Sequence, residues 1–161
     1  MHKVAPQIQE KITIPILHIA QATAQALLAD GIQKVGLLGT KYTMTQDFYK
    51  EKLIESGLEV LIPDQAGITE VNRIIYDELC LGDIKESSKQ TYLTIIDDLK
   101  KAGAEAVILG CTEIGLLVKQ SDTDLPLYDT TVIHAEKAAE WAVISDHRRQ
   151  AQPWVRACNF V

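Results

Sequence analysis

The chain has 161 residues, an apolar content of 47% and a formal net charge of −6, from 22 acidic and 16 basic side chains. This length and apolar content suit one domain with its own hydrophobic core. The acidic balance and the lack of a basic stripe argue against a nucleic-acid partner, and no apolar run reaches the roughly 18 residues that a membrane-spanning helix needs.

Helical and strand-like patterns alternate along the chain. Apolar residues at helical spacing predict the end of a helix over residues 4–12, residues 14–19 predict a strand, and the Ala-rich residues 20–29 predict a helix that stops at Gly31. Further on, strands are predicted over 34–40, 59–63, 105–110 and 125–129, and helices over 44–56, 68–79, 84–102, 114–118 and 132–144.

The last four predicted strands are nearly all apolar, and helices separate them. This arrangement is typical of a parallel sheet that is covered on both faces. We therefore predict an α/β fold with a four-stranded parallel sheet flanked by helices. Residues 145–161 lack a clean period, and we expect a tail that is poorly ordered or docks weakly.

Cys111 follows the predicted strand 105–110, at the edge where an open parallel sheet usually binds its ligand. Gly110 leaves room for close approach, and the helix that Thr112 and Glu113 open presents free N–H groups that favour an anion. We expect the same helix end to lower the thiol pKa below its usual ~8.5. The alternative is a small core residue, which is the commoner role of a free cysteine at this place.

The turn at residues 39–44 lies at the same edge of the predicted sheet. The hydroxyls of Thr40, Tyr42 and Thr43, together with backbone donors, could bind a carboxylate. The alternative is an ordinary strand-to-helix turn in which Thr43 is the helix N-cap.

His134 follows the fourth of these strands, at the start of the last predicted helix. An imidazole there could orient Cys111 or exchange a proton with it. The alternative is a histidine that only satisfies local hydrogen bonds at the helix start.

The three cysteines, Cys80, Cys111 and Cys158, are odd in number and widely spaced. They fit neither a metal-ligand pattern nor a disulfide framework. We therefore expect a reducing, cytoplasmic location. Cys80 falls on a helical pattern and is predicted to lie in the core.

The tetrad Gly110-Cys111-Thr112-Glu113, between a strand and a short helix, resembles the second half of the aspartate/glutamate racemase family. The resemblance covers about positions 1 to 143. It extends to residues 37–44, 47–49, 78–82, 114–117, 129–130 and 134–136.

The resemblance implies two similar α/β lobes with the active site between them, and neither a cofactor nor a metal. One cysteine thiolate removes the α-proton of an acidic amino acid, and a second thiol on the opposite face returns a proton. The implied site residues are Cys111 as an acid/base, Thr40, Tyr42, Thr43 and Thr112 as substrate-binding residues, and Glu113 and His134 as supporting residues.

One departure from the family pattern concerns the start of the chain. In the family, a Cys-Asn-Thr motif runs directly into a segment like Met1-His2-Lys3, so the first cysteine would lie upstream. Residues 1–30 then correspond to a remnant of the first lobe and the linking helix, and residues 31–131 to the second lobe. Residues 132–144 correspond to a helix that returns to the first lobe, and residues 145–161 to a tail outside the resemblance.

From this correspondence we expect the chain alone to be inactive and the helix 132–144 to expose an apolar face. A homodimer fits the complete protein, although no surface feature fixes its arrangement. Two other functions stay open: a decarboxylase-type relative that needs only Cys111, and a small-molecule binding module in which Cys111 is structural. The sequence does not distinguish aspartate from glutamate as the substrate.

Overall fold

The computed structural model describes the backbone of residues 4–150 and the side chains of residues 4–143. Its helices are α1 (Ala5–Gln9), α2 (Ile19–Ala29), α3 (Lys41–Thr45), α4 (Asp47–Glu55), α5 (Gln65–Asp77), α6 (Glu86–Lys101), α7 (Ile114–Leu117) and α8 (Thr130–Gln150), with the 3-10 turns η2 (Leu79–Leu81) and η3 (Gln120–Asp122). Its strands are β1 (Lys34–Leu38), β2 (Glu59–Leu61), β3 (Ala106–Leu109) and β4 (Leu127–Asp129). The residues Met1-His2-Lys3, the tail after residue 150 and Cys158 lie outside the described residues.

The four strands form one parallel sheet in the order β2-β1-β3-β4. The central strand β3 is buried throughout and β1 is buried except at its first residue, whereas the short strands β2 and β4 are partly exposed at the two edges. The near-continuous apolar sequence of the central strands follows from this burial on both faces. The predicted α/β fold with a four-stranded parallel sheet is confirmed.

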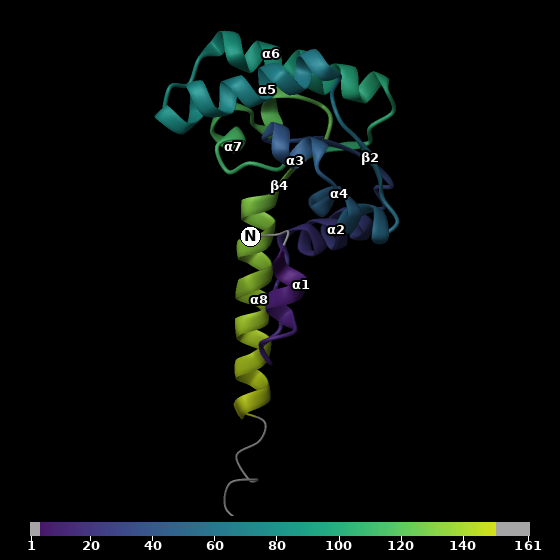
Figure 1. Ribbon diagram of the computed structural model, residues 1–161, viewed down its shortest axis with the longest axis vertical. Helices are drawn as coiled ribbons and strands as arrows, with labels where there is room; N and C mark the ends of the chain where they lie inside the picture. Colours follow the sequence, from purple (N-terminus) through teal and green to yellow (C-terminus); the bar gives the residue numbers. More distant parts are fainter. Residues whose placement is uncertain (1–3, 151–161) are drawn as a thin grey trace, which may run out of the picture.

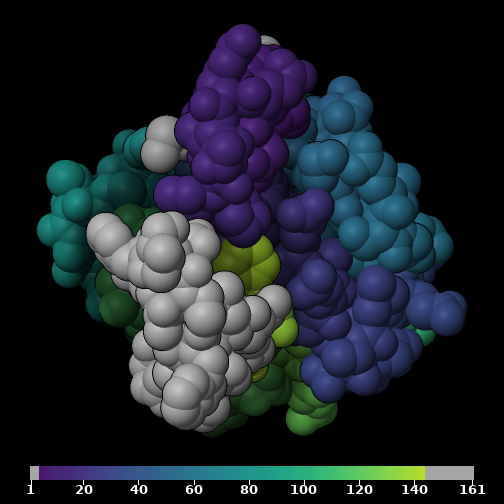
Figure 2. Space-filling view, turned by 90° about the horizontal axis from the view of Figure 1, so that it is seen from below, coloured from purple at the N-terminus to yellow at the C-terminus, as the bar shows by residue number. Residues whose placement is uncertain are grey.

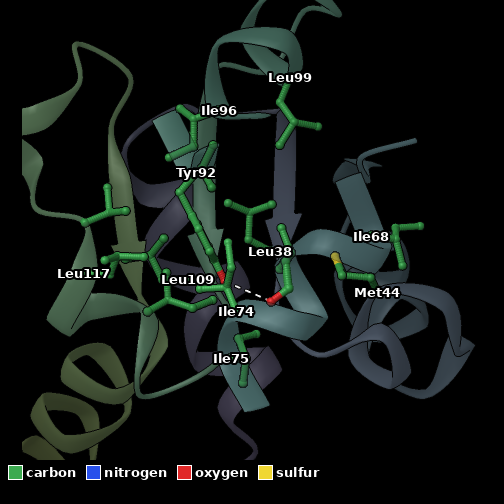
Figure 3. Packing of buried hydrophobic residues seen from close by; sticks show 14 of the residues in the cluster. Leu38, Met44, Ile68, Ile74, Ile75, Tyr92, Ile96, Leu99, Leu109 and Leu117 are labelled. Carbon is green, nitrogen blue, oxygen red and sulfur yellow. Dashed lines mark hydrogen bonds between the residues drawn. The ribbon is translucent and has the colours of Figure 1, made fainter. Parts of the chain in front are cut away.

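Alternate residues of the central strands enter two separate cores. Leu38, Val107 and Leu109 pack against α5, α6 and α7 on one face. Val35, Leu37, Ala106 and Ile108 pack against α2 and α4 on the other face. Figure 3 shows the first core, where Tyr92 of α6 reaches in between Leu38 and Leu109. The alternation of side chains along β1 and β3 therefore provides the apolar surface for the helices on each face of the sheet.

Helix α8 extends away from the sheet, and α1 lies on the same side of the sheet as α8 (Figure 1). Seen from below, part of α8 is visible beside the N-terminal residues (Figure 2). α8 packs against α2, and Nε2 of His134 lies 3.0 Å from the carbonyl oxygen of Leu17. Apolar side chains of α1 and α8 stay exposed, among them Ile8 at 41%, Val132 at 51% and Trp141 at 38%.

The predicted strand over residues 14–19 is wrong. Residues 15–18 are not in a strand, and helix α2 already begins at Ile19. The side chain of Gln9 forms hydrogen bonds with the backbone of this segment. Its Nε2 donates to the carbonyl of Ile14 at 3.2 Å, and its Oε1 accepts from the N–H of Ile16 at 2.7 Å. The segment has a β-like sequence, but it pairs with no strand among the described residues.

Three other predictions need correction. The helix predicted over 44–56 is two helices, because Gln46 takes an extended conformation at ψ 151° between α3 and α4. The helix predicted over 132–144 is longer, since α8 runs from Thr130 to Gln150. Cys80 is exposed on η2 and does not lie in the core. Among the described residues, no helix is both long and apolar enough to cross a membrane.

The central strand β3 offers a direct test of the packing. Ile108 is fully buried between the sheet and the α2/α4 layer. Replacing it with Ala leaves a cavity, and Ile108→Ala should lower the free energy of unfolding by about 2–5 kcal/mol in chemical denaturation. Ile54 on α4 is 56% exposed, so Ile54→Ala is the matched control and should change the free energy of unfolding by less than about 1 kcal/mol. Equal losses in the two variants would contradict this packing.

Candidate active site

The chain order of the strands places two turns side by side at one edge of the sheet. β2 lies on one side of β1 and β3 on the other, so the connections after β1 and β3 lead in opposite directions. In open α/β sheets, ligands bind at this point, outside the carboxyl ends of the strands. The turn after β1 holds Thr40 and Thr43, and the turn after β3 holds Cys111 and Glu113.

Two glycines let these turns approach closely. The N–H of Gly110 donates to the carbonyl of Leu38 at 2.7 Å, and a Cβ atom on Gly110 would lie only 2.8 Å from that carbonyl oxygen. A Cβ atom on Gly39 would lie 3.2 Å from the side chain of Thr43 and 3.5 Å from the carbonyl oxygen of Gly110. A side chain at Gly110 would push the two turns apart, and a side chain at Gly39 would crowd Thr43 within its own turn.

Thr40 and Thr43 are joined to each other. Thr40 is the N-cap of α3: its Oγ1 accepts from the N–H of Thr43 at 3.3 Å and lies 3.1 Å from the hydroxyl oxygen of Thr43. The alternative in which Thr43 is the N-cap is therefore wrong. A Cβ on Gly110 would lie 3.6 Å from Cγ2 of Thr43, so this threonine borders the Cys111 turn.

Cys111 is half-buried, and its Sγ donates to Oε2 of Glu113 at 2.9 Å. Burial and the neighbouring carboxylate raise the pKa of the Cys111 thiol to about 12. The lowered pKa expected from the sequence is wrong. The expected lowering depended on the N-terminus of the helix after Cys111. That helix, α7, has only four residues and begins beyond Glu113, so its dipole affects the thiol pKa less than the nearby carboxylate does.

Glu113 is the partner of the thiol in this turn. The hydrogen bond with Cys111 holds the pKa of Glu113 below its usual value, and a hydrogen bond with the side chain of Thr112 has the next largest effect in the same direction. The turn therefore carries an ionised carboxylate next to a protonated thiol. Thr112 itself is exposed.

Two further polar groups are buried in this part of the fold. Tyr92 is fully buried in the core against which Cys111 packs, and its pKa is raised by burial first and by Cys111 second. Glu78 is buried, and bonds from Ser88 Oγ at 2.5 Å and Arg73 Nη1 at 2.8 Å lower its pKa. Tyr92 had no signal in the sequence beyond its helical pattern, whereas Glu78 lies in the segment 78–82 to which the resemblance extends.

Tyr42 and His134 have other contacts in the structure. Tyr42 is 58% exposed, with its ring centroid 5.8 Å from that of Phe48. His134 contacts the carbonyl of Leu17, which joins α8 to the N-terminal segment. The start of α8 is tied to β3 through Thr130, whose Oγ1 donates to the carbonyl of Leu109 at 2.9 Å. The roles predicted for Tyr42 and His134 at the site stay predictions.

Two hollows are found elsewhere on the lobe. One lies between α5 and α6, around Pro63, Gly67 and Leu99, and the other lies between α1 and α2, around Gln9 and His18. Cys111 lines neither of them. In the part of the chain that the structure describes, no three His, Cys, Asp or Glu side chains are grouped as metal ligands would be.

The chain is similar to racemases in both sequence and structure. The model of the family described as Asp/Glu/Hydantoin racemase matches residues 1–138. A crystal structure of a candidate Asp/Glu racemase from Yersinia pestis is 50% identical, with a TM-score of 0.86 over 89% of this chain and 63% of that chain. An aspartate racemase homologue from Pyrococcus horikoshii OT3 is 41% identical, with a TM-score of 0.82 over 88% of this chain and 62% of that chain.

Curated relatives show the same likeness at lower identity. A glutamate racemase from Hydrogenobaculum sp. is 29% identical over 127 residues, which are 74% of this chain and 44% of that protein. An uncharacterized protein from the pnlA 3′ region of Pectobacterium carotovorum is 30% identical over 136 residues, which are 83% of this chain and 89% of that protein. The chain thus spans less than half of the glutamate racemase and under two thirds of the two crystallised relatives.

The raised pKa of Cys111 predicts slow alkylation. With Cys80→Ser and Cys158→Ser as the background, iodoacetamide should react with Cys111 at pH about 8 at least about tenfold more slowly than with free cysteine, because only the thiolate is nucleophilic. The rate should rise as the pH approaches about 12, the pKa of the thiol. A rate like that of free cysteine, with a midpoint near ~8.5, would contradict this assignment.

Proposed function

Because the chain belongs to the Asp/Glu/Hydantoin racemase family, we propose that it supplies the Cys111 half of a racemase site for an acidic amino acid. One observation supports this most strongly. The turn that holds Cys111 and the turn that holds Thr40 and Thr43 meet at the reversal of strand order, where such sheets bind small ligands.

The substrate class rests on the donors at this edge and on the relatives. Thr40, Thr43 and Thr112 carry hydroxyl groups at this edge of the sheet, and hydroxyl and backbone N–H groups are suited to a carboxylate. Tyr42 would add a further hydroxyl from the same turn. The similar proteins from Hydrogenobaculum and Pyrococcus horikoshii carry the names glutamate racemase and aspartate racemase homologue. We infer a substrate with two carboxylates, of the aspartate or glutamate type.

The proposed reaction transfers two protons and needs no cofactor. A thiolate on one face of the substrate takes the α-proton: the Cα–H bond breaks, an S–H bond forms, and the electron pair stays on the α-carbon. A thiol on the opposite face then gives its proton to that carbon, and its sulfur keeps the electron pair. Hydrogen-bond donors around the substrate carboxylate stabilise the carbanion. Two thiols are needed because a single base returns the proton to the face from which it came.

Cys111 would be one of these two thiols. The other described cysteine, Cys80, lies on η2, which packs against α7, and we propose that it is not the thiol that faces Cys111 across the substrate. We propose that the second thiol belongs to a first lobe that includes residues 1–30 and onto which residues 132–144 return. Such a first lobe would cover the apolar side chains of α1 and α8 that are exposed in this chain.

Three further proposals follow from the resemblance. The 161-residue chain alone does not racemise, because the partner thiol belongs to the proposed first lobe. The complete protein works in the cytoplasm, where cysteines stay reduced. The complete protein forms a homodimer.

A hybrid protein tests the proposed function. In it, this chain replaces the matched part of the Yersinia pestis protein, so that the unmatched remainder supplies the first lobe. The hybrid should racemise aspartate or glutamate and exchange the α-proton with heavy water. Polarimetry and proton NMR report the two events.

Two variants of the hybrid serve as controls. Cys111→Ser should lower racemisation by at least about 1,000-fold, because serine is a far weaker acid than cysteine. Cys80→Ser is the matched thiol control and should retain activity. Racemisation that survives Cys111→Ser would overturn the role of Cys111, and clear racemisation by the 161-residue chain alone would overturn the need for a partner thiol.

The two alternative functions make different predictions. A decarboxylase-type relative with Cys111 as its single required thiol would release carbon dioxide from a malonate-type substrate. A non-catalytic binding module would bind its ligand equally well in the Cys111→Ser variant. Carbon dioxide release and calorimetric binding to the two forms separate these functions from the racemase.

A further inference from the structure

We propose that Glu113 is a positioning residue that keeps Cys111 protonated, so that Cys111 enters the proposed reaction as the proton-donating thiol. The inference rests on the proposed function for its second half only. Its first half, the protonation of Cys111, concerns the substrate-free chain.

The geometry of the Glu113 carboxylate supports this assignment. Its Oε2 accepts from Sγ of Cys111 at 2.9 Å, which is a close contact for a sulfur donor. A carboxylate has no proton to donate at neutral pH, so it can only accept from the sulfur and therefore needs the thiol form. A second hydrogen bond, from the side chain of Thr112, acts on the same carboxylate and lowers its pKa. The carboxylate therefore stays ionised and keeps its proton-accepting role.

Most of the other influences on Cys111 act in the same direction. Burial against the core with Tyr92 disfavours the thiolate, and Cys80 on η2 adds to the effect. The exception is a hydrogen bond with the backbone of Glu113, which lowers the pKa of the thiol but has a smaller effect than burial and the Glu113 carboxylate. Tyr92 of α6 lies in the same core, and Glu78, between α5 and η2, acts on Tyr92. None of the groups that shift the pKa of Cys111 is a cation, although a cation is what usually activates a cysteine as a base.

This arrangement assigns the roles in the proposed reaction. A thiolate base on the opposite face would remove the α-proton, and Cys111 would return one: its S–H bond breaks, the Cα–H bond forms, and the electron pair remains on sulfur. The Cys111 thiolate that is left beside an ionised Glu113 is destabilised. Before the next turnover it would regain a proton from water, and the opposite thiol would release to water the proton that it took from the substrate.

The protonation of Cys111 can be measured on the chain itself, with Cys80→Ser and Cys158→Ser as the background. Glu113→Gln replaces the carboxylate with an amide that can donate a hydrogen bond to a thiolate. Its rate of alkylation at pH about 8 should rise at least about tenfold, with the whole pH profile moved to lower pH. Glu113→Asp retains the charge and should keep the slow profile. Glu51→Gln, at an exposed carboxylate on α4, is the matched control and should leave the profile unchanged.

An alkylation profile for Glu113→Gln that matches the unsubstituted background would overturn the proposal. A second measurement needs no variant of Glu113 and covers the case in which that variant does not fold. In the Raman spectrum at neutral pH, Cys111 should give an S–H stretching band below the position of a free thiol, and Cys111→Ser should remove the band. A missing band would show a thiolate, and a band at the free position would show that the bond to Glu113 is not made. Because both measurements use the substrate-free chain, their failure is distinct from an inactive hybrid.

Discussion

The close contact between the ends of β1 and β3 is the constraint on which the candidate site depends. The hydrogen bond from Gly110 to Leu38 continues the parallel pairing beyond β3, and the absence of a side chain at Gly110 lets the two turns touch. Gly36 has a similar effect lower in β1, where a Cβ would lie 2.9 Å from Leu99 of α6. The turn with Cys111 and the turn with Thr40 and Thr43 can therefore meet because β1, β3 and α6 pack closely at these glycines.

The chemistry of the thiol follows from the environment that this packing creates. Cys111 lies at the boundary between the core around Tyr92 and the open edge of the sheet. Its nearest polar partner is an acid, Glu113. Burial and negative charge both favour the neutral form, and the four-residue helix α7 does not outweigh them. The same two factors keep the proton on Cys111 at neutral pH and make the thiol a poor nucleophile.

Much of the fold could be predicted from the sequence because the central strands are apolar throughout and glycines mark the turns. The placement of Cys111 and of the Thr40–Thr43 turn at one edge also followed from that pattern. The state of the thiol could not be predicted, since it depends on a side-chain contact with Glu113 and on burial that no spacing reveals. The strand predicted over residues 14–19 is wrong for a related reason. A strand needs a neighbouring strand as its hydrogen-bond partner, and here the side chain of Gln9 bonds to the backbone instead. The break at Gln46 and the extension of α8 to Gln150 depend equally on local backbone geometry.

The central claim is that the two turns at the reversal of strand order form one site for an acidic amino acid. The most direct test maps the backbone amide chemical shifts of the chain by NMR during titration with aspartate and glutamate. The account predicts saturable changes at residues 39–43 and 110–113 together, with one common dissociation constant. Changes centred on the hollow around Pro63 and Leu99, or no saturable change at either turn, would contradict it.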